Sequence, residues 1–117
     1  MTTYLERLPK HDKLFIPFIM SGDPTPELTI KLALLLEEAG ASVLELGVPY
    51  SDPLADGPVI QRASKRALAH KTTITSTMEL AGEMRRRGLK IPIILFTYFN
   101  PVLQLGEESF FALAKQN

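Results

Sequence analysis

Three short apolar segments, separated by helical patterns, constrain the fold of this chain more than any other feature. They cover residues 14–20, 41–48 and 91–96, and each is typical of a strand buried on both faces of a sheet. Pro17 argues against the first strand, because proline cannot donate a hydrogen bond to a neighbouring strand. Strand, helix and strand in this order predict parallel pairing with right-handed crossovers, and hence an α/β fold.

Helical patterns follow each of these segments and also precede the first. We expect helices over residues 3–12, 26–39, 59–70, 76–87 and 107–116, with a loop over 97–101. The second helix begins after a Thr25 cap, and its apolar face comprises Leu28, Leu32, Leu35, Leu36 and Ala39. A strand–helix repeat of roughly 35 to 45 residues is typical of α/β barrels. We therefore expect one partial domain over residues 1–117 that holds three such units.

The composition is that of a soluble globular protein, with 45% apolar and 22% charged residues. The formal net charge is +0, which gives no electrostatic basis for binding nucleic acid or a membrane surface. There are no cysteines, and neither His11 nor His70 has a partner at metal-ligand spacing, so we expect no disulfide and no metal site. The sequence has no recognisable signal peptide or membrane span, and we expect a cytoplasmic location.

Glu45 interrupts the apolar segment 41–48, where a charged residue is unexpected. A carboxylate on a buried strand is costly unless it is paired, hydrogen-bonded or used in chemistry. One interpretation is an ion pair with a Lys or Arg elsewhere in the chain. The other is a general acid/base, because the sites of parallel α/β folds lie beyond the carboxyl ends of the strands. Apolar surroundings also suit a carboxylate that exchanges protons near neutral pH.

A loop with two further carboxylates, Asp52 and Asp56, follows this strand and contains prolines that stiffen it. Both aspartates could be turn formers, since Asp before Pro or Gly is common in turns. Alternatively, they form an acid/base site together with Glu45. Tyr98 and Asn100 follow the third predicted strand and should face the same end of the sheet as Glu45.

Residues 44–58 read Leu-Glu-Leu-Gly-Val-Pro-Tyr-Ser-Asp-Pro-Leu-Ala-Asp-Gly-Pro. This run closely resembles the corresponding segment of tryptophan synthase alpha subunits, and its length makes the match highly specific. Pro17-Phe18, Gly22-Asp23-Pro24, Tyr98 and Asn100 also fall where that family has similar residues. The resemblance implies a (β/α)₈ TIM barrel, which takes roughly 250 residues, of which this chain would hold the first three βα units.

The resemblance also implies an activity, the retro-aldol cleavage of indole-3-glycerol phosphate to indole and glyceraldehyde 3-phosphate in tryptophan biosynthesis. Glu45 matches the catalytic acid/base of the family, and Asp56 matches the acid that hydrogen-bonds the indole nitrogen. Phe18, Ile60 and Tyr98 match positions that line the indole pocket.

The same resemblance implies a partner, the beta subunit, in an α₂β₂ complex. Asp52, Pro53 and Asn100 match positions in the contact with that subunit. Pyridoxal phosphate belongs to the beta subunit, so we expect no cofactor in this chain. The family's phosphate-binding loops and mobile lid have no counterpart here, and the chain alone is expected to be inactive. The alternative is a non-catalytic fragment that acts only as a folding or interaction module.

Overall fold

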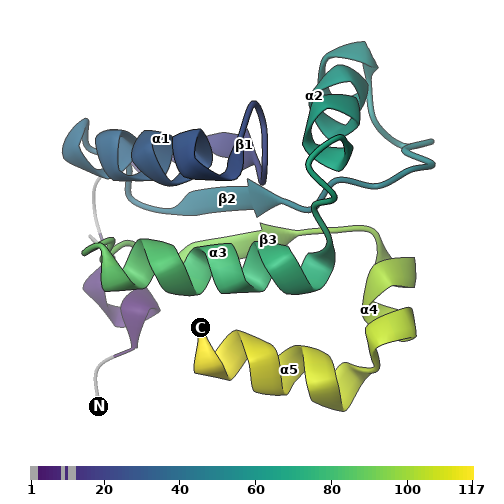
Figure 1. Cartoon of the computed structure of the whole chain (residues 1–117). Helices are drawn as coiled ribbons and strands as arrows, with labels where there is room; N and C mark the ends of the chain where they lie inside the picture. The colour runs from purple at the N-terminus through teal and green to yellow at the C-terminus, as the bar shows by residue number, and fades with distance from the viewer. Residues whose placement is uncertain (1–2, 9, 11–12) are drawn as a thin grey trace.

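The computed structural model describes residues 3–8, 10 and 13–117 and shows strands alternating with helices (Figure 1). In chain order the elements are a 3₁₀ helix η1 (Tyr4–Arg7), β1 (Phe18–Met20), α1 (Pro26–Glu38), β2 (Leu44–Gly47), α2 (Pro58–Leu68), α3 (Ile74–Arg86), β3 (Ile93–Phe96), α4 (Phe99–Leu105) and α5 (Glu107–Gln116). The strands form one parallel sheet in the order β1-β2-β3. This arrangement confirms the predicted α/β fold with parallel pairing.

The two faces of the sheet have different surroundings. Side chains alternate along a strand, so Leu44 and Leu46 of β2 point to one face and Glu45 points to the other. On the first face the sheet packs against α1 and α3, and the main core comprises Ile30, Ala33, Leu44, Leu46, Met84 and Leu89. On the second face Ile94 and Phe96 are 44% and 53% exposed. We call this second side the open face, and it carries the candidate site.

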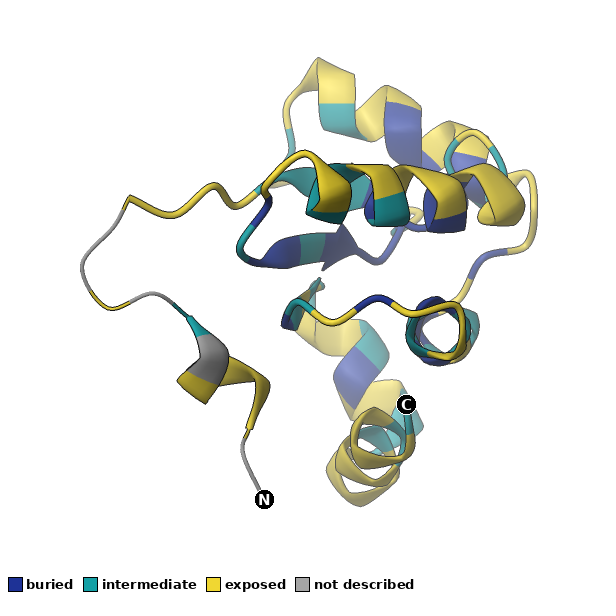
Figure 2. Ribbon diagram, turned by 90° about the vertical axis from the view of Figure 1, so that its left-hand side faces the viewer, coloured by how far each residue is buried: buried dark blue, intermediate teal, exposed yellow. Residues whose placement is uncertain are grey.

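The face that α1 buries differs from the prediction. Thr29, Ile30 and Ala33 are the buried residues of this helix. Of the predicted apolar face, Leu36 packs against the core, but Leu28, Leu32 and Leu35 are exposed, and the outer surfaces of the helices are yellow in Figure 2. Apolar residues cover more than one side of α1, and the side that carries Ile30 and Ala33 packs on the sheet. No described element covers the exposed leucines.

The first strand is shorter than its apolar segment. Leu14, Phe15 and Ile16 are exposed and lie outside β1, although the carbonyl of Phe15 still accepts a hydrogen bond from the Ser42 N–H at 2.8 Å. Pro17 has no N–H to donate, and no described strand lies on the outer side of β1, so regular pairing begins only at Phe18.

The other element boundaries follow local chemistry. The expected helix over 3–12 is a single 3₁₀ turn, Tyr4–Arg7, and residues 9, 11 and 12 lie outside the described residues. Helix α3 begins two residues earlier than predicted, because the Thr73 and Ser76 side chains cap it reciprocally. Helix α5 has the predicted bounds.

Helix α4 was not predicted, and it begins inside the segment 97–101 that was expected to be a loop. Pro101 occupies the third position of α4. The N–H groups of a helix's first turn have no partner within the helix, so a proline there removes no hydrogen bond. Helix α4 therefore starts directly after Tyr98, at the carboxyl end of β3.

Candidate functional site

Glu45 lies in the middle of β2 on the open face, between Phe18 of β1 and Ile94 of β3 in the register of the sheet. Its side chain is half-buried rather than fully buried, because no described helix covers this part of the sheet. Its N–H donates to the Pro17 carbonyl at 2.9 Å, but within the described residues its carboxylate forms neither a hydrogen bond nor an ion pair. The structural ion pair considered from the sequence is therefore absent from the described part of the chain.

Gly47 creates space for an aromatic ring at the carboxyl end of β2. A Cβ atom at this position would lie 2.5 Å and 2.9 Å from Cζ and Cε2 of Phe18. Only a residue without a side chain lets the Phe18 ring cross β2 here. The ring then meets Phe96 of β3 edge to face, with the ring centroids 5.6 Å apart. These two rings line the open face next to Glu45.

Asp56 lies on the loop between β2 and α2, and groups on both sides of it fix the backbone. Its own N–H donates to the Pro53 carbonyl at 3.1 Å, and its carbonyl accepts from the Gln61 side chain at 2.8 Å. The N–H of the preceding residue, Ala55, donates to the Tyr98 hydroxyl at 3.0 Å. Backbone groups and other side chains thus close this turn, and the Asp56 carboxylate is half-buried.

Tyr98 also interacts electrostatically with this carboxylate. Burial raises the pKa of the Tyr98 phenol, and the neighbouring Asp56 carboxylate raises it further, while the hydrogen bond from Ala55 opposes the shift. The phenol therefore stays protonated at neutral pH and presents a neutral hydroxyl to Asp56.

Most of the predicted site residues line one small hollow. Phe18, Asp56, Ile60 and Tyr98 all line it, together with Met20, Gly47, Val48, Phe96 and Thr97. Its cavity volume is only about 10 Å³, close to the space that one water molecule needs. Four parts of the chain meet there: the end of β1, the end of β2, the start of α2, and the turn after β3. Glu45 does not line the hollow and lies two residues before Gly47, on the same face.

The residues predicted to contact a partner lie on the outside of the same end of the sheet. Asp52 and Asn100 are exposed, and Pro53 is half-buried. Leu54, at the tip of the loop, is 85% exposed, and the N–H of the next residue, Ala55, is held by Tyr98. Sequence reasoning missed Tyr50 and Gln61, which support the loop. Tyr50 stands within the motif and could have been found there.

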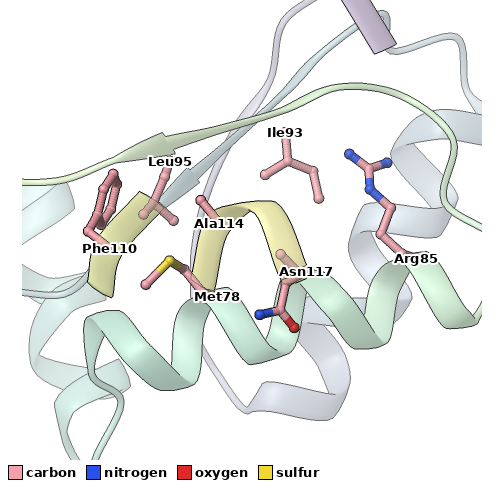
Figure 3. A pocket seen from close by; sticks show the side chains of 8 residues that line it. Met78, Arg85, Ile93, Leu95, Phe110, Ala114 and Asn117 are labelled. Atoms are coloured by element: carbon pink, nitrogen blue, oxygen red, sulfur yellow. The ribbon is translucent and has the colours of Figure 1, made fainter. Parts of the chain in front are cut away.

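A second hollow lies between α3, β3 and α5, away from the predicted residues (Figure 3). Its polar lining groups already have partners within the chain. Arg85 donates to the carbonyls of Leu89 and Ile91, and Asn117 donates to that of Leu113. These donors are thus used within the chain, and the hollow contains none of the predicted site residues.

Among the described residues there is no group of three or more His, Cys, Asp or Glu side chains that could hold a metal ion. No helix in this part of the chain is long and apolar enough to cross a membrane. The chemistry available at the open face is therefore that of carboxylates, a phenol and aromatic rings.

Comparison with known proteins identifies close relatives. A family model described as "Tryptophan synthase alpha chain" matches residues 5–117. The tryptophan synthase alpha chain of Geobacillus sp. strain WCH70 is 71% identical over 104 residues, which cover 89% of this chain and 40% of that relative. The alpha chain of Bacillus subtilis strain 168 is 66% identical over 106 residues, which cover 91% of this chain and 40% of that relative.

Solved structures give the same result. The crystal structure of tryptophan synthase subunit alpha from Legionella pneumophila strain Paris matches with a TM-score of 0.86 at 45% identity, covering 89% of this chain and 40% of that one. A tryptophan synthase complex from Pyrococcus furiosus matches with a TM-score of 0.82 at 39% identity, covering 90% and 43%. The chain thus spans about 40% of the length of the curated relatives given above.

Proposed function

Because this chain belongs to the tryptophan synthase alpha chain family, we propose that it supplies the catalytic carboxylates of a lyase. The lyase cleaves indole-3-glycerol phosphate into indole and glyceraldehyde 3-phosphate. The three strands correspond to the first βα units of the family's (β/α)₈ barrel. One observation carries the proposal: Phe18, Asp56, Ile60 and Tyr98 surround one hollow at the carboxyl end of the sheet. Such a position is where barrel enzymes place their sites.

The roles of the two carboxylates follow from the bond that breaks. Cleavage requires a proton at indole C3 and loss of the proton from the neighbouring glycerol hydroxyl, whose electron pair forms the aldehyde carbonyl as the carbon–carbon bond breaks. Glu45, half-buried and without a described partner, is the group that takes and delivers these protons. Asp56 accepts a hydrogen bond from the indole N–H and stabilises the positive charge that develops on the ring.

The aromatic side chains bind the indole. Phe18 and Phe96 present an edge-to-face pair at the hollow, and Ile60 adds an aliphatic wall from α2. Flat apolar walls of this kind suit an indole ring, which prefers stacked or edge-to-face contacts with other rings. The substrate's phosphate has no binding group proposed within these residues, so the isolated chain is expected to be inactive.

The partner in this proposal is the beta subunit, which contacts the exposed outer side of the loop through Asp52, Pro53 and Asn100. Pyridoxal phosphate belongs to that subunit, and this chain needs no cofactor for its own reaction. A cytoplasmic location stays a prediction. A second candidate function is a non-catalytic interaction module, which the 85% exposure of Leu54 at the loop tip favours.

A chimeric enzyme separates the two functions. The corresponding residues of the Geobacillus stearothermophilus alpha chain, which is 71% identical over 104 residues, are replaced by those of this chain. We expect the chimera to release indole from indole-3-glycerol phosphate, and Glu45→Gln to reduce kcat by at least about a hundredfold. Glu38→Gln, at an exposed position of α1, is the matched control and should leave kcat unchanged.

Two results would contradict the catalytic proposal. A folded chimera that releases no indole would leave only the interaction module. Normal turnover by the Glu45→Gln variant would remove Glu45 from the reaction.

A further inference from the structure

The loop that carries Asp56 is connected to the segment after β3 by a continuous set of side-chain contacts. The rings of Tyr50 and Tyr98 are stacked, with their centroids 4.8 Å apart and their planes 24° from parallel. The Tyr50 hydroxyl accepts a hydrogen bond from the Asn100 side chain at 3.2 Å. The Tyr98 hydroxyl in turn accepts the Ala55 N–H at 3.0 Å.

Asp56 therefore sits between two side-chain tethers. On its carboxyl side, Gln61 of α2 holds the Asp56 carbonyl at 2.8 Å. On its amino side, Tyr98 holds the N–H of Ala55. Gln61 is one turn into a helix, and the helix backbone limits its freedom. Tyr98 precedes α4 in extended conformation, so the direction of its ring depends on what packs against it.

Tyr50 is the aromatic side chain that packs flat against Tyr98. Its hydrogen bond with Asn100 fixes the position of the Tyr50 hydroxyl, and the stack restrains the Tyr98 ring. A tyrosine side chain has few rotatable bonds, so two such rings can be held at little entropic cost. Tyr98 belongs to the segment that follows β3, and Tyr50 is hydrogen-bonded to Asn100 of the same segment.

We propose that Tyr50 is a positioning residue for Asp56. Tyr50 is stacked on Tyr98 and anchored by Asn100, and it keeps the Tyr98 hydroxyl within hydrogen-bonding distance of the Ala55 N–H. Holding Ala55 in turn holds the adjacent Asp56 in place. The effect on catalysis rests on the proposed function, whereas the effect on loop geometry does not. Displacing a reacting group by a fraction of an ångström lowers the rate steeply, so a support of this kind affects turnover more than binding.

The geometric half is tested on the 117-residue chain by NMR measurement of amide-proton exchange with water. Tyr98→Phe keeps the stack but removes the acceptor, and should accelerate exchange of the Ala55 amide by at least about fivefold. Tyr50→Leu should accelerate it to the same extent, while the amides of Leu46 and Val48 in the sheet keep their rates. Tyr4→Phe, in η1, is the matched control and should change none of these rates.

Unchanged Ala55 exchange in Tyr50→Leu, alongside faster exchange in Tyr98→Phe, would overturn the proposal. Unchanged exchange in both variants would also overturn it, because the hydrogen bond would then be absent in solution. If Tyr50→Leu loses the sheet amides as well, Asn100→Ala decides the question. This exposed substitution removes only the anchor of Tyr50, and should accelerate Ala55 exchange by at least about twofold; no change would overturn the proposal.

The catalytic half is tested in the chimeric enzyme. Tyr50→Leu should lower kcat by about tenfold with KM changed by less than about threefold, because Asp56 contributes mainly in the transition state. Tyr50→Phe retains the stack and should recover most of the lost kcat. A loss confined to KM, or no recovery with phenylalanine, would overturn the positioning role. An inactive chimera with the predicted exchange pattern would overturn the proposed function and leave the loop geometry standing.

Discussion

The ring of Phe18 lies in the space that a side chain on Gly47 would fill, with Cζ only 2.5 Å from the position of that Cβ. A glycine in a strand usually weakens it, since it adds no packing and increases the flexibility of the unfolded chain. Here it lets an aromatic ring cross from β1 over β2 towards Phe96. The same glycine that ends β2 therefore shapes the candidate indole pocket.

Gly47→Ala is the direct test of this relationship. The added methyl group forces the Phe18 ring to move, and overpacking of this kind costs about 1–3 kcal/mol of unfolding free energy, measurable by urea denaturation. Gly57→Ala is the comparison, because nothing lies within 4 Å of its Cβ position; Gly57 is the N-cap of α2, where Ala is less favourable than Gly, so this variant should lose about 0.5–1 kcal/mol. Equal stability of the two variants would show that Phe18 does not occupy this space.

The sequence was sufficient to predict the parallel sheet, and to predict that the site lies at the carboxyl end of its strands. Glu45 and the loop after it could be placed because strand order fixes which ends of parallel strands meet. Sequence could not show which side of α1 is buried, since apolar residues lie on more than one side of that helix. Nor could it show the Tyr50–Tyr98 stack, which joins residues far apart in the chain through ring orientation rather than through any periodic pattern.

Glu37 of α1 provides a second testable contact, between a helix and the start of β3. One of its carboxylate oxygens accepts the N–H groups of Lys90 and Ile91 at 2.7 Å and 2.8 Å. Hydrogen bonds to a charged acceptor are stronger than neutral ones, so Glu37→Ala should lower the unfolding free energy by about 1–3 kcal/mol.

Urea denaturation at neutral pH measures this loss. The control is Glu38→Ala, which removes an exposed carboxylate with no hydrogen-bond or ion-pair partner among the described residues, and should cost less than about 0.5 kcal/mol. Equal stability of the two variants would show that the Glu37 contact is not formed in solution.

Arg87 connects α1 and α3 through two carboxylates. Its guanidinium lies 2.6 Å from Glu27 and 3.0 Å from Glu83, and Glu83 also pairs with Arg86 at 2.7 Å. Hydrogen bonding to Arg87 lowers the pKa of Glu27, and hydrogen bonding to Arg86 and Arg87 lowers that of Glu83, both from an ordinary value of 4.5.

As the pH falls towards and below 4.5, Glu27 and Glu83 therefore bind protons more readily in the unfolded chain than in the folded chain. The contribution to stability is complete above pH 4.5 and is lost as the pH falls through the lowered pKa values. Arg87→Ala should lower the urea midpoint at pH 7, and its difference from the unmodified chain should vanish in strong acid. Arg62→Ala, at an exposed position, should show no such pH dependence. High salt should weaken the effect, because these groups are exposed. A pH-independent difference would contradict the role of the two carboxylates.

The open face leads to a prediction about the isolated chain. Ile94 and Phe96 are exposed there, and the outer edges of β1 and β3 have no partner strand among the described residues. Unpaired edges beside an apolar surface favour pairing with another chain. At about 100 µM the 117-residue chain should elute from a size-exclusion column as a dimer or larger species.

Ile94→Lys should shift it towards monomer, since a charge on the open face opposes burial and has Glu45 beside it in the sheet register. Leu103→Lys, at a similarly exposed position on α4, tests whether location matters and should leave association intact. Association that both substitutions abolish equally would mean that exposed apolar area in general, rather than the open face, drives it.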